Sequence, residues 1–220
     1  IFTSSRIDEL YSIGYGHMQQ FNLPVHQNFE ISDVYQQGNI FYMATKGFLY
    51  QFYRTPERFQ LMHSEPVALY EICSTPQHAY GISRGWLVEI GDGFHRRVMS
   101  LPTKAYCLLV KDDRWAYVGG ADGLFLADLQ QKTSEKIKNC TVPVSRLLLS
   151  KTKDLYLTTY GNGFGKLTGD RYERLSGDSI PDGFNDLTED RYGTIWLASR
   201  QGLYQYHPTT KIFRLLNRSN

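Results

Sequence analysis

The sequence predicts an all-β fold, a β-propeller built of four-stranded antiparallel blades. A glycine recurs at intervals of 38, 38, 40 and 39 residues, each time between two short aromatic-rich segments, at Gly47, Gly85, Gly123, Gly163 and Gly202. This period is too short for an independent domain and is close to that of one propeller blade, roughly 40–50 residues. Helical periodicity is nearly absent, and short alternating runs bounded by Gly, Pro, Asn and Asp occur throughout.

The repeat divides the chain into one propeller region, residues 1–220, with five complete blades and a partial first blade. The expected boundaries are 1–27 for the partial blade, then 28–65, 66–103, 104–143, 144–183 and 184–220. Ile1 falls at the phase of a second strand, so we expect an excerpt of a larger ring of about seven blades. We therefore expect an open arc in which residues 1–20 do not pair with residues 205–216.

The last repeat shows how each blade is built. FNDLTED is the expected inner strand, and a turn leads to TIWLAS, which is short and rich in β-branched and aromatic residues. A glycine turn leads into LYQYH, and Pro208 precedes the outer strand IFRLL. Earlier second strands are expected at 40–45, 79–83, 116–120 and 155–159. Their aromatic residues are expected to fill the space between neighbouring blades.

Composition excludes some functions. The chain has 24 Lys and Arg against 22 Asp and Glu and no dense basic run, so no nucleic acid is expected as a partner. No apolar run approaches the roughly 20 residues that span a bilayer, so this segment is not expected to contact a membrane. Cys73 and Cys107 lie in apolar segments and are expected in the core, while Cys140 lies near a blade junction. The six histidines show neither HxH nor HxxxH spacing, and we expect no metal or other cofactor.

Catalytic motifs were weighed against ordinary turns. Residues 81–85 match GxSxG, the nucleophile pattern of α/β-hydrolases, but they fall at the phase of a blade turn and the apolar segment WLVEI follows. The acidic pairs at 112–113 and 189–190 fall at strand-to-strand turns, where Asp bonds its own backbone. We expect no enzyme in this fragment. Carboxylates paired from different blades would leave no local trace, so a propeller lyase or glycosidase stays an alternative.

Residues 185–216, NDLTEDRYGTIWLASRQGLYQYHPTTKIFRLL, resemble the two-component regulator propeller repeat. The matching residues are Glu189, Asp190, Gly193, Ile195, Trp196, Gly202, Leu203, Tyr206, Pro208 and Phe213. His207 replaces the usual Asp. Residues 111–129 are a recognisable second copy, and the other repeats match mainly by period.

This resemblance implies a periplasmic sensor region of a membrane-spanning histidine kinase, often of the hybrid kind found in Bacteroidetes. The parent chain would then carry further blades, an immunoglobulin-like domain, a membrane helix and the kinase activity. The resemblance implies a non-enzymatic sensor that binds a glycan-derived ligand, such as an oligosaccharide, or transmits its signal. The alternative function is a protein-interaction scaffold, and a second copy of the chain in a homodimer is a further candidate partner. The ligand class stays open, because no ligand residue belongs to the repeat motif itself.

The turns between second and third strands are the best candidates for a ligand site, because in propellers they surround the mouth of the central channel. That register contains Arg6, Lys46, Arg84, Asp122, Tyr160, Asn162 and Arg200. These side chains could hold an acidic or hydroxylated ligand by hydrogen bonds and ring stacking, or they could be solvated turn residues. The segment TTYGNG at 158–163 has one residue more than its counterparts, which favours a functional turn there.

Overall fold

The computed structural model describes residues 2–6, 9–14, 17–22, 31–55, 58–75, 78–91, 94–177, 180 and 182–216. The described residues form strands and turns, and no helix among them is long and apolar enough to cross a membrane. The chain divides into two compact units, residues 1–97 and residues 98–220.

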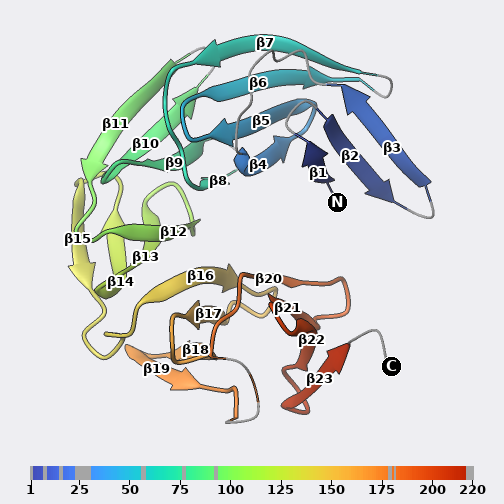
Figure 1. The fold of residues 1–220 in the computed structure, drawn as a ribbon. Coiled ribbons are helices and arrows are strands. Elements are labelled where there is room, and N and C mark those ends of the chain that lie inside the picture. The colour runs from blue at the N-terminus through green and yellow to red at the C-terminus, as the bar shows by residue number, and fades with distance from the viewer. Residues whose placement is uncertain are drawn as a thin grey trace. The chain divides into compact units, whose positions relative to one another are not determined.

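The first unit contains a three-stranded sheet and two four-stranded sheets (Figure 1). Blade 1 consists of β1 (Phe2–Arg6), β2 (Glu9–Gly14) and β3 (His17–Asn22). Blade 2 consists of β4 (Ile31–Gln37), β5 (Ile40–Thr45), β6 (Leu49–Arg54) and β7 (Phe59–Glu65). Blade 3 consists of β8 (Ile72–Ser74), β9 (Ala79–Ser83), β10 (Trp86–Gly91) and β11 (Phe94–Ser100), which reaches the second unit.

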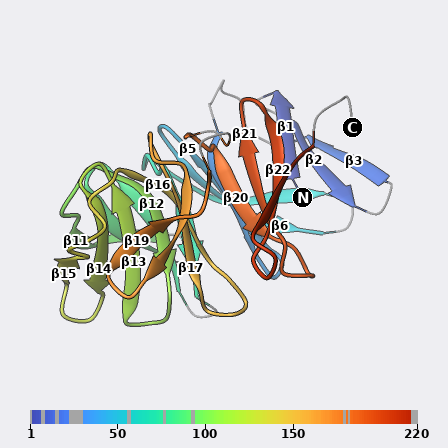
Figure 2. The same ribbon diagram turned by 90° about the horizontal axis from the view of Figure 1, so that it is seen from below.

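The second unit contains three four-stranded sheets, and the strands of blade 4 lie side by side in Figure 2. Blade 4 consists of β12 (Ala105–Val110), β13 (Trp115–Gly120), β14 (Gly123–Asp128) and β15 (Thr133–Lys136). Blade 5 consists of β16 (Val144–Leu149), β17 (Leu155–Thr159), β18 (Phe164–Thr168) and β19 (Arg171–Arg174). Blade 6 consists of β20 (Asp186–Glu189), β21 (Ile195–Ser199), β22 (Gly202–His207) and β23 (Ile212–Leu216).

The predicted all-β architecture of five four-stranded antiparallel blades and a partial first blade is confirmed. The expected second strands coincide with β5, β9 and β17, and β13 begins one residue earlier, at Trp115. The inner strand of blade 6 is shorter than predicted, because β20 contains only Asp186–Glu189. The open arc, the larger ring of about seven blades and the grouping of all residues into a single propeller region stay predictions.

The core of each unit lies between neighbouring blades, as the aromatic pattern predicts. In the first unit, Tyr42 of blade 2 is buried in one cluster with Leu69 and Val88 of blade 3. In the second unit, the fully buried ring of Phe164 in blade 5 lies 5.2 Å from the ring of Tyr206 in blade 6. Edge-to-face contacts of this kind add to the free energy gained by burying apolar surface.

The three cysteines are free thiols. Cys107 and Cys140 are fully buried in the cluster between blades 4 and 5, whereas Cys73 in β8 is half-buried. Burial raises the pKa of the Cys140 thiol to about 11. Cys140 is therefore a core residue in the same sense as Cys107, which its position near a blade junction did not indicate.

The turns contain the backbone bonds expected of their acidic residues. Asp112 Oδ1 accepts the N–H groups of Arg114 and Trp115, and Asp190 Oδ1 accepts those of Tyr192 and Thr194. The GxSxG segment forms the end of β9 and a hairpin turn into β10. Arg84 and Gly85 have φ angles of 44° and 85° there, the positive values that a tight two-residue hairpin requires. A strand follows the serine instead of a helix, so the segment is not a nucleophile elbow.

Candidate functional site

Four of the predicted ligand residues lie in the second unit, in the turns between the second and third strands of its blades. Asp122 belongs to the β13–β14 turn, Tyr160 and Asn162 to the β17–β18 turn, and Arg200 to the β21–β22 turn. We call residues 121–122, 160–162 and 200–201 the mouth turns.

The blade 5 mouth turn has three residues where its counterparts have two. Thr159 N donates to Gly163 O at 2.9 Å across residues 160–162, whereas Ser199 pairs with Gly202 across residues 200–201. The buried Thr159 hydroxyl closes the turn, because it donates to Gly163 O at 2.9 Å and accepts Asn162 N at 3.1 Å. Gly161 and Gly163 have φ angles of 87° and 72°, which only glycine adopts without strain. The longer turn leaves the Tyr160 side chain 55% exposed.

Tyr160 contacts an aromatic residue of the neighbouring blade. Its ring centroid lies 5.4 Å from that of Tyr106 on β12, with an interplanar angle of 87°. Lys104 Nζ lies 5.8 Å from the centroid of Tyr106, within reach of a cation–π interaction. We call Lys104, Tyr106 and Tyr160 the aromatic cluster. It joins an inner strand of blade 4 to a mouth turn of blade 5.

A β-bulge places Tyr106. Ala105 pairs with Gly120 and Cys107 pairs with Gly119, so Tyr106 is an extra residue in β12. Such a residue is unpaired in the ladder, and the bulge re-aims the side chains beside it. Tyr106 was not among the predicted site residues. The segment AYCLLV is apolar throughout, so its sequence has no alternation in which the bulge could be recognised.

Asp122 is held in place by the connection between blades 3 and 4. Its Oδ2 accepts the hydroxyl of Thr103 at 2.8 Å, and its own N–H donates to that hydroxyl at 3.2 Å. Ala121 N donates to Lys104 O at 3.1 Å, so the same turn also holds the backbone of Lys104. The carboxylate of Asp122 is thus held by Thr103, the residue that precedes Lys104 of the aromatic cluster. Asp122 remains exposed.

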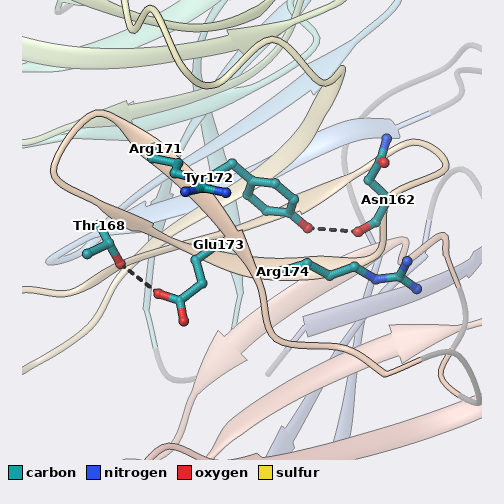
Figure 3. A pocket seen from close by; sticks show the side chains of 6 residues that line it. All are labelled: Asn162, Thr168, Arg171, Tyr172, Glu173 and Arg174. Carbon is teal, nitrogen blue, oxygen red and sulfur yellow. Dashed lines mark hydrogen bonds between the residues drawn. The ribbon is translucent and has the colours of Figure 1, made fainter.

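The blade 5 turn is also bound to the connection that enters blade 6. Gly161 N and Gly163 N both donate to Asp182 O, at 3.2 and 3.0 Å. The Asn162 carbonyl oxygen accepts the Tyr172 hydroxyl at 2.8 Å (Figure 3), whereas the ring of Tyr160 contacts Tyr106. Tyr160 and Asn162 therefore belong to one turn but have different partners.

Two inner strands contribute a further charged pair that the sequence analysis did not predict. Arg146 Nε on β16 lies 3.7 Å from Asp186 Oδ1 on β20. The Asp186 side chain is 74% exposed, so this ion pair adds little to stability and both groups stay accessible to a ligand.

Three further predicted residues, Lys46, Arg84 and Arg200, lie exposed in turns of their own blades. Arg200 is exposed, and no hydrogen bond or ion pair joins its side chain to another residue in the described part of the chain. In the first unit, Lys46 and Arg84 lie exposed in the β5–β6 and β9–β10 turns. Arg6 ends β1, and its side chain lies outside the described residues. Within the described ranges, no group of three or more His, Cys, Asp or Glu residues could hold a metal ion.

Comparison with known proteins gives structural matches only. No protein-family model and no curated protein matches the chain. The extracellular domain assigned to the hybrid two-component system BT4673 of B. thetaiotaomicron is 16% identical with a TM-score of 0.76, over 97% of this chain and 31% of that one. The corresponding domain of BT3049 is 14% identical with a TM-score of 0.65, over 82% and 29%. Virginiamycin B lyase from Staphylococcus aureus is 12% identical with a TM-score of 0.74, over 97% and 78%.

At these identities the matches establish the fold. The resemblance to extracellular regions of two-component sensors is therefore confirmed as a similarity of structure. The chain spans 31% of the length of the BT4673 domain, so it corresponds to part of a larger extracellular region in that protein.

Proposed function

We propose that this chain is part of a non-enzymatic sensor propeller of a two-component system. It would lie in the periplasm and pass its signal to a membrane-spanning histidine kinase in the same parent chain. The repeat motif at residues 185–216 and the structural similarity to two-component extracellular domains support this assignment.

Within this propeller, the aromatic cluster is the proposed contact for a glycan-derived ligand. The observation that carries the proposal is the contact between Tyr160 and Tyr106, which spans two blades and leaves Tyr160 half exposed at the longest mouth turn. Sugar rings present C–H groups that pack on aromatic faces, and their hydroxyls bond to charged groups around the ring. Lys104 supplies such a group within the cluster, and Asp122, which is bonded to Thr103, supplies another.

Calorimetric titration of the chain with a panel of soluble oligosaccharides tests the ligand class. Tyr160→Ala should weaken binding of any active oligosaccharide by about 1–3 kcal/mol, because it removes an aromatic anchor. The free energy of unfolding should change by less than about 0.5 kcal/mol, because the side chain is mostly exposed. Tyr106→Ala should weaken the same binding.

Tyr192→Ala is the matched control, because Tyr192 is also an exposed turn tyrosine but lies between β20 and β21, outside the mouth turns. Equal loss of binding in Tyr192→Ala and Tyr160→Ala would contradict the proposed site. Conversion of an oligosaccharide into new products would instead support the propeller lyase or glycosidase. A coding sequence without a membrane helix and a kinase downstream of this region would contradict the sensor assignment.

A further inference from the structure

The outer strand of blade 5 borders an open pocket of about 670 Å³. Six residues line it, and Figure 3 shows how they lie around the ring of Tyr172: Asn162, Thr168, Arg171, Tyr172, Glu173 and Arg174. Asn162 belongs to the blade 5 mouth turn, but none of the six residues belongs to the aromatic cluster.

A glycine opposite the outer strand makes room for the ring of Tyr172, which lines this pocket. Gly165 on β18 pairs with Arg174, and a Cβ atom at Gly165 would lie 2.3 Å from Glu173 O and 2.4 Å from Tyr172 Cε2. Without that atom, the Tyr172 ring can lie against β18 and its hydroxyl can donate to Asn162 O. Burial raises the pKa of Tyr172 to about 12, so this hydroxyl remains a donor at neutral pH. The ring is thus a fixed wall of the pocket.

Two arginines line the pocket, and they differ in their hydrogen-bond partners. Arg174 donates to Asp182 Oδ1 at 2.8 Å and to Ser176 Oγ at 3.3 Å. Arg171 is exposed, and its guanidinium forms no ion pair with any residue that the structure describes. A guanidinium presents a planar fork of N–H donors that matches a carboxylate, so both arginines are suited to bind one.

Hydrogen-bonding groups for a neutral part of a ligand lie beside the arginines. The Thr168 hydroxyl donates to Glu173 Oε2 at 3.1 Å, which fixes that carboxylate and leaves its other oxygen available. Carboxylate oxygens accept hydroxyl hydrogens, and the Asn162 amide can both donate and accept. The lining therefore combines an exposed arginine, Arg171, with acceptors for hydroxyl groups.

Asp182 shows how a carboxylate binds here. Its side chain is 57% exposed and already pairs with Arg174, so it occupies the position that a ligand carboxylate would take. Its backbone oxygen accepts Gly161 N and Gly163 N of the blade 5 mouth turn. A ligand that displaces Asp182 from Arg174 would therefore loosen a connection that holds this turn.

We propose that this pocket binds a small hydroxylated carboxylate, whose acid group pairs with Arg171 and competes with Asp182 for Arg174. The hydroxyls of the ligand bond to Glu173 and Asn162. The proposal does not depend on the sensor assignment or on the aromatic cluster.

Calorimetric titration of the 220-residue chain with D-glucuronate and with D-glucose tests this site, because the two sugars differ only in the carboxylate. D-glucuronate should bind and D-glucose should not. Arg171→Gln and Arg174→Gln should each weaken glucuronate binding about tenfold or more, because each removes a charge-assisted hydrogen-bond donor. Asp182→Asn should tighten binding several-fold, because it removes the competing charge and keeps the backbone oxygen.

Arg214→Gln is the matched control, since Arg214 is an exposed arginine on β23, the outer strand of blade 6. This variant should bind glucuronate as tightly as the unmodified chain does. Tyr160→Ala should also leave glucuronate binding unchanged, so this proposal and the sensing site can fail separately. Absence of glucuronate binding, equal binding of D-glucose, or weaker binding by Asp182→Asn would overturn the proposal. Arg171 is exposed, so Arg171→Gln tests the site even if Arg174→Gln does not fold.

Discussion

Blades 5 and 6 are neighbouring copies of one repeat, yet they use its variable positions differently. Both place a large aromatic side chain at the second residue of the second strand, Tyr156 in blade 5 and Trp196 in blade 6. They differ in the length of the mouth turn, in the side chain that caps the turn between the first and second strands, and in the sequence of the outer strand. The outer strand of blade 5 reads RYER and that of blade 6 reads IFRLL. Packing between blades fixes the common positions, and the turns and outer strands are free to acquire a site.

The outer strands differ because of the residue opposite them. Blade 6 has Tyr204 at the position of Gly165, and this buried ring packs edge-to-face on Phe184 at 5.9 Å. Leu215, paired with Tyr204, packs against the same cluster, whereas its counterpart Arg174 borders the pocket. One glycine thus separates an apolar outer strand from a polar one.

The largest effect is expected from Gly165→Ala, which tests this difference directly. The added methyl group would lie 2.3 Å from a backbone oxygen, so the outer strand must shift. We expect a loss of about 3 kcal/mol in the free energy of unfolding, the upper range for overpacking. Urea denaturation measures it.

Gly169→Ala in the same blade is the control for Gly165→Ala. Nothing lies within 4 Å of a Cβ atom at Gly169, but its φ of 63° disfavours a side chain, so a loss of about 1 kcal/mol is expected. Lys132 and Lys211 adopt φ angles of 57° and 58° in the same kind of turn, which shows that a side chain is tolerated there. Equal losses in the two variants would show that the contact with the outer strand is unimportant.

We expect the hydroxyl that closes the mouth turn to contribute more to the free energy of unfolding in blade 5 than in blade 6. Thr159→Val removes a buried hydroxyl that bonds to two backbone groups, and a loss of about 1–2 kcal/mol in the free energy of unfolding is expected. Ser199→Ala removes the equivalent hydroxyl of the shorter turn, which is half-buried, and about 0.5–1 kcal/mol is expected there. Urea denaturation of the two variants compares them. A larger loss in Ser199→Ala would mean that the longer turn depends less on its cap than the geometry indicates.

The smallest expected effect is a dependence of stability on pH. The turn between the first and second strands is capped by Asp190 in blade 6 and by Ser150 in blade 5. The hydrogen bond from Trp196 Nε1, followed by those from backbone N–H groups, lowers the pKa of Asp190. A carboxyl with a lowered pKa stabilises the fold above its unfolded pKa of about 3.9, and this contribution is lost as the pH falls through the folded value. Asp190→Ser should therefore melt at a lower temperature than the unmodified chain near pH 6.

Thermal melting between pH 3 and pH 7 measures this difference. The gap in melting temperature between Asp190→Ser and the unmodified chain should narrow as the pH falls below about 4, because Asp190 becomes protonated. Ser150→Ala, which removes the neutral cap of blade 5, should cause a shift that does not vary with pH. A gap for Asp190→Ser that stays constant down to pH 3 would show that Asp190 is not ionised when it caps the turn.

The fold could be predicted from the sequence because its signals are local and repeated. Four of the five recurring glycines have a positive φ at the turn before a third strand, namely Gly85, Gly123, Gly163 and Gly202. Each aromatic second strand must be buried between sheets. These demands recur with one period, so β5, β9 and β17 could be located to the residue. The extra residue of the blade 5 mouth turn could be predicted for the same reason, because an insertion in one repeat makes its turn longer than the corresponding turns of the other repeats.

The contacts of the site could not be predicted, because they join residues from different blades. A bulge at Tyr106 changes which residues meet the neighbouring turn, and a bulge leaves almost no mark in the alternation of a short strand. Asn162 and Tyr160 were grouped by their register, yet Asn162 meets Tyr172, whose ring position depends on Gly165. Which ligand these residues bind, and whether Arg6, Lys46, Arg84 and Arg200 contribute, stay predictions.

Cys140 has a practical consequence for studying how the blades move. Its thiol is fully buried between blades 4 and 5 and has a pKa of about 11, so it presents almost no thiolate to a reagent at neutral pH. Alkylation of Cys140 therefore has to wait for that seam to open, and its rate measures how often it opens. The half-buried Cys73 supplies an internal reference in the same reaction. Mass spectrometry of the alkylated chain can therefore measure the rate of local opening without an engineered label.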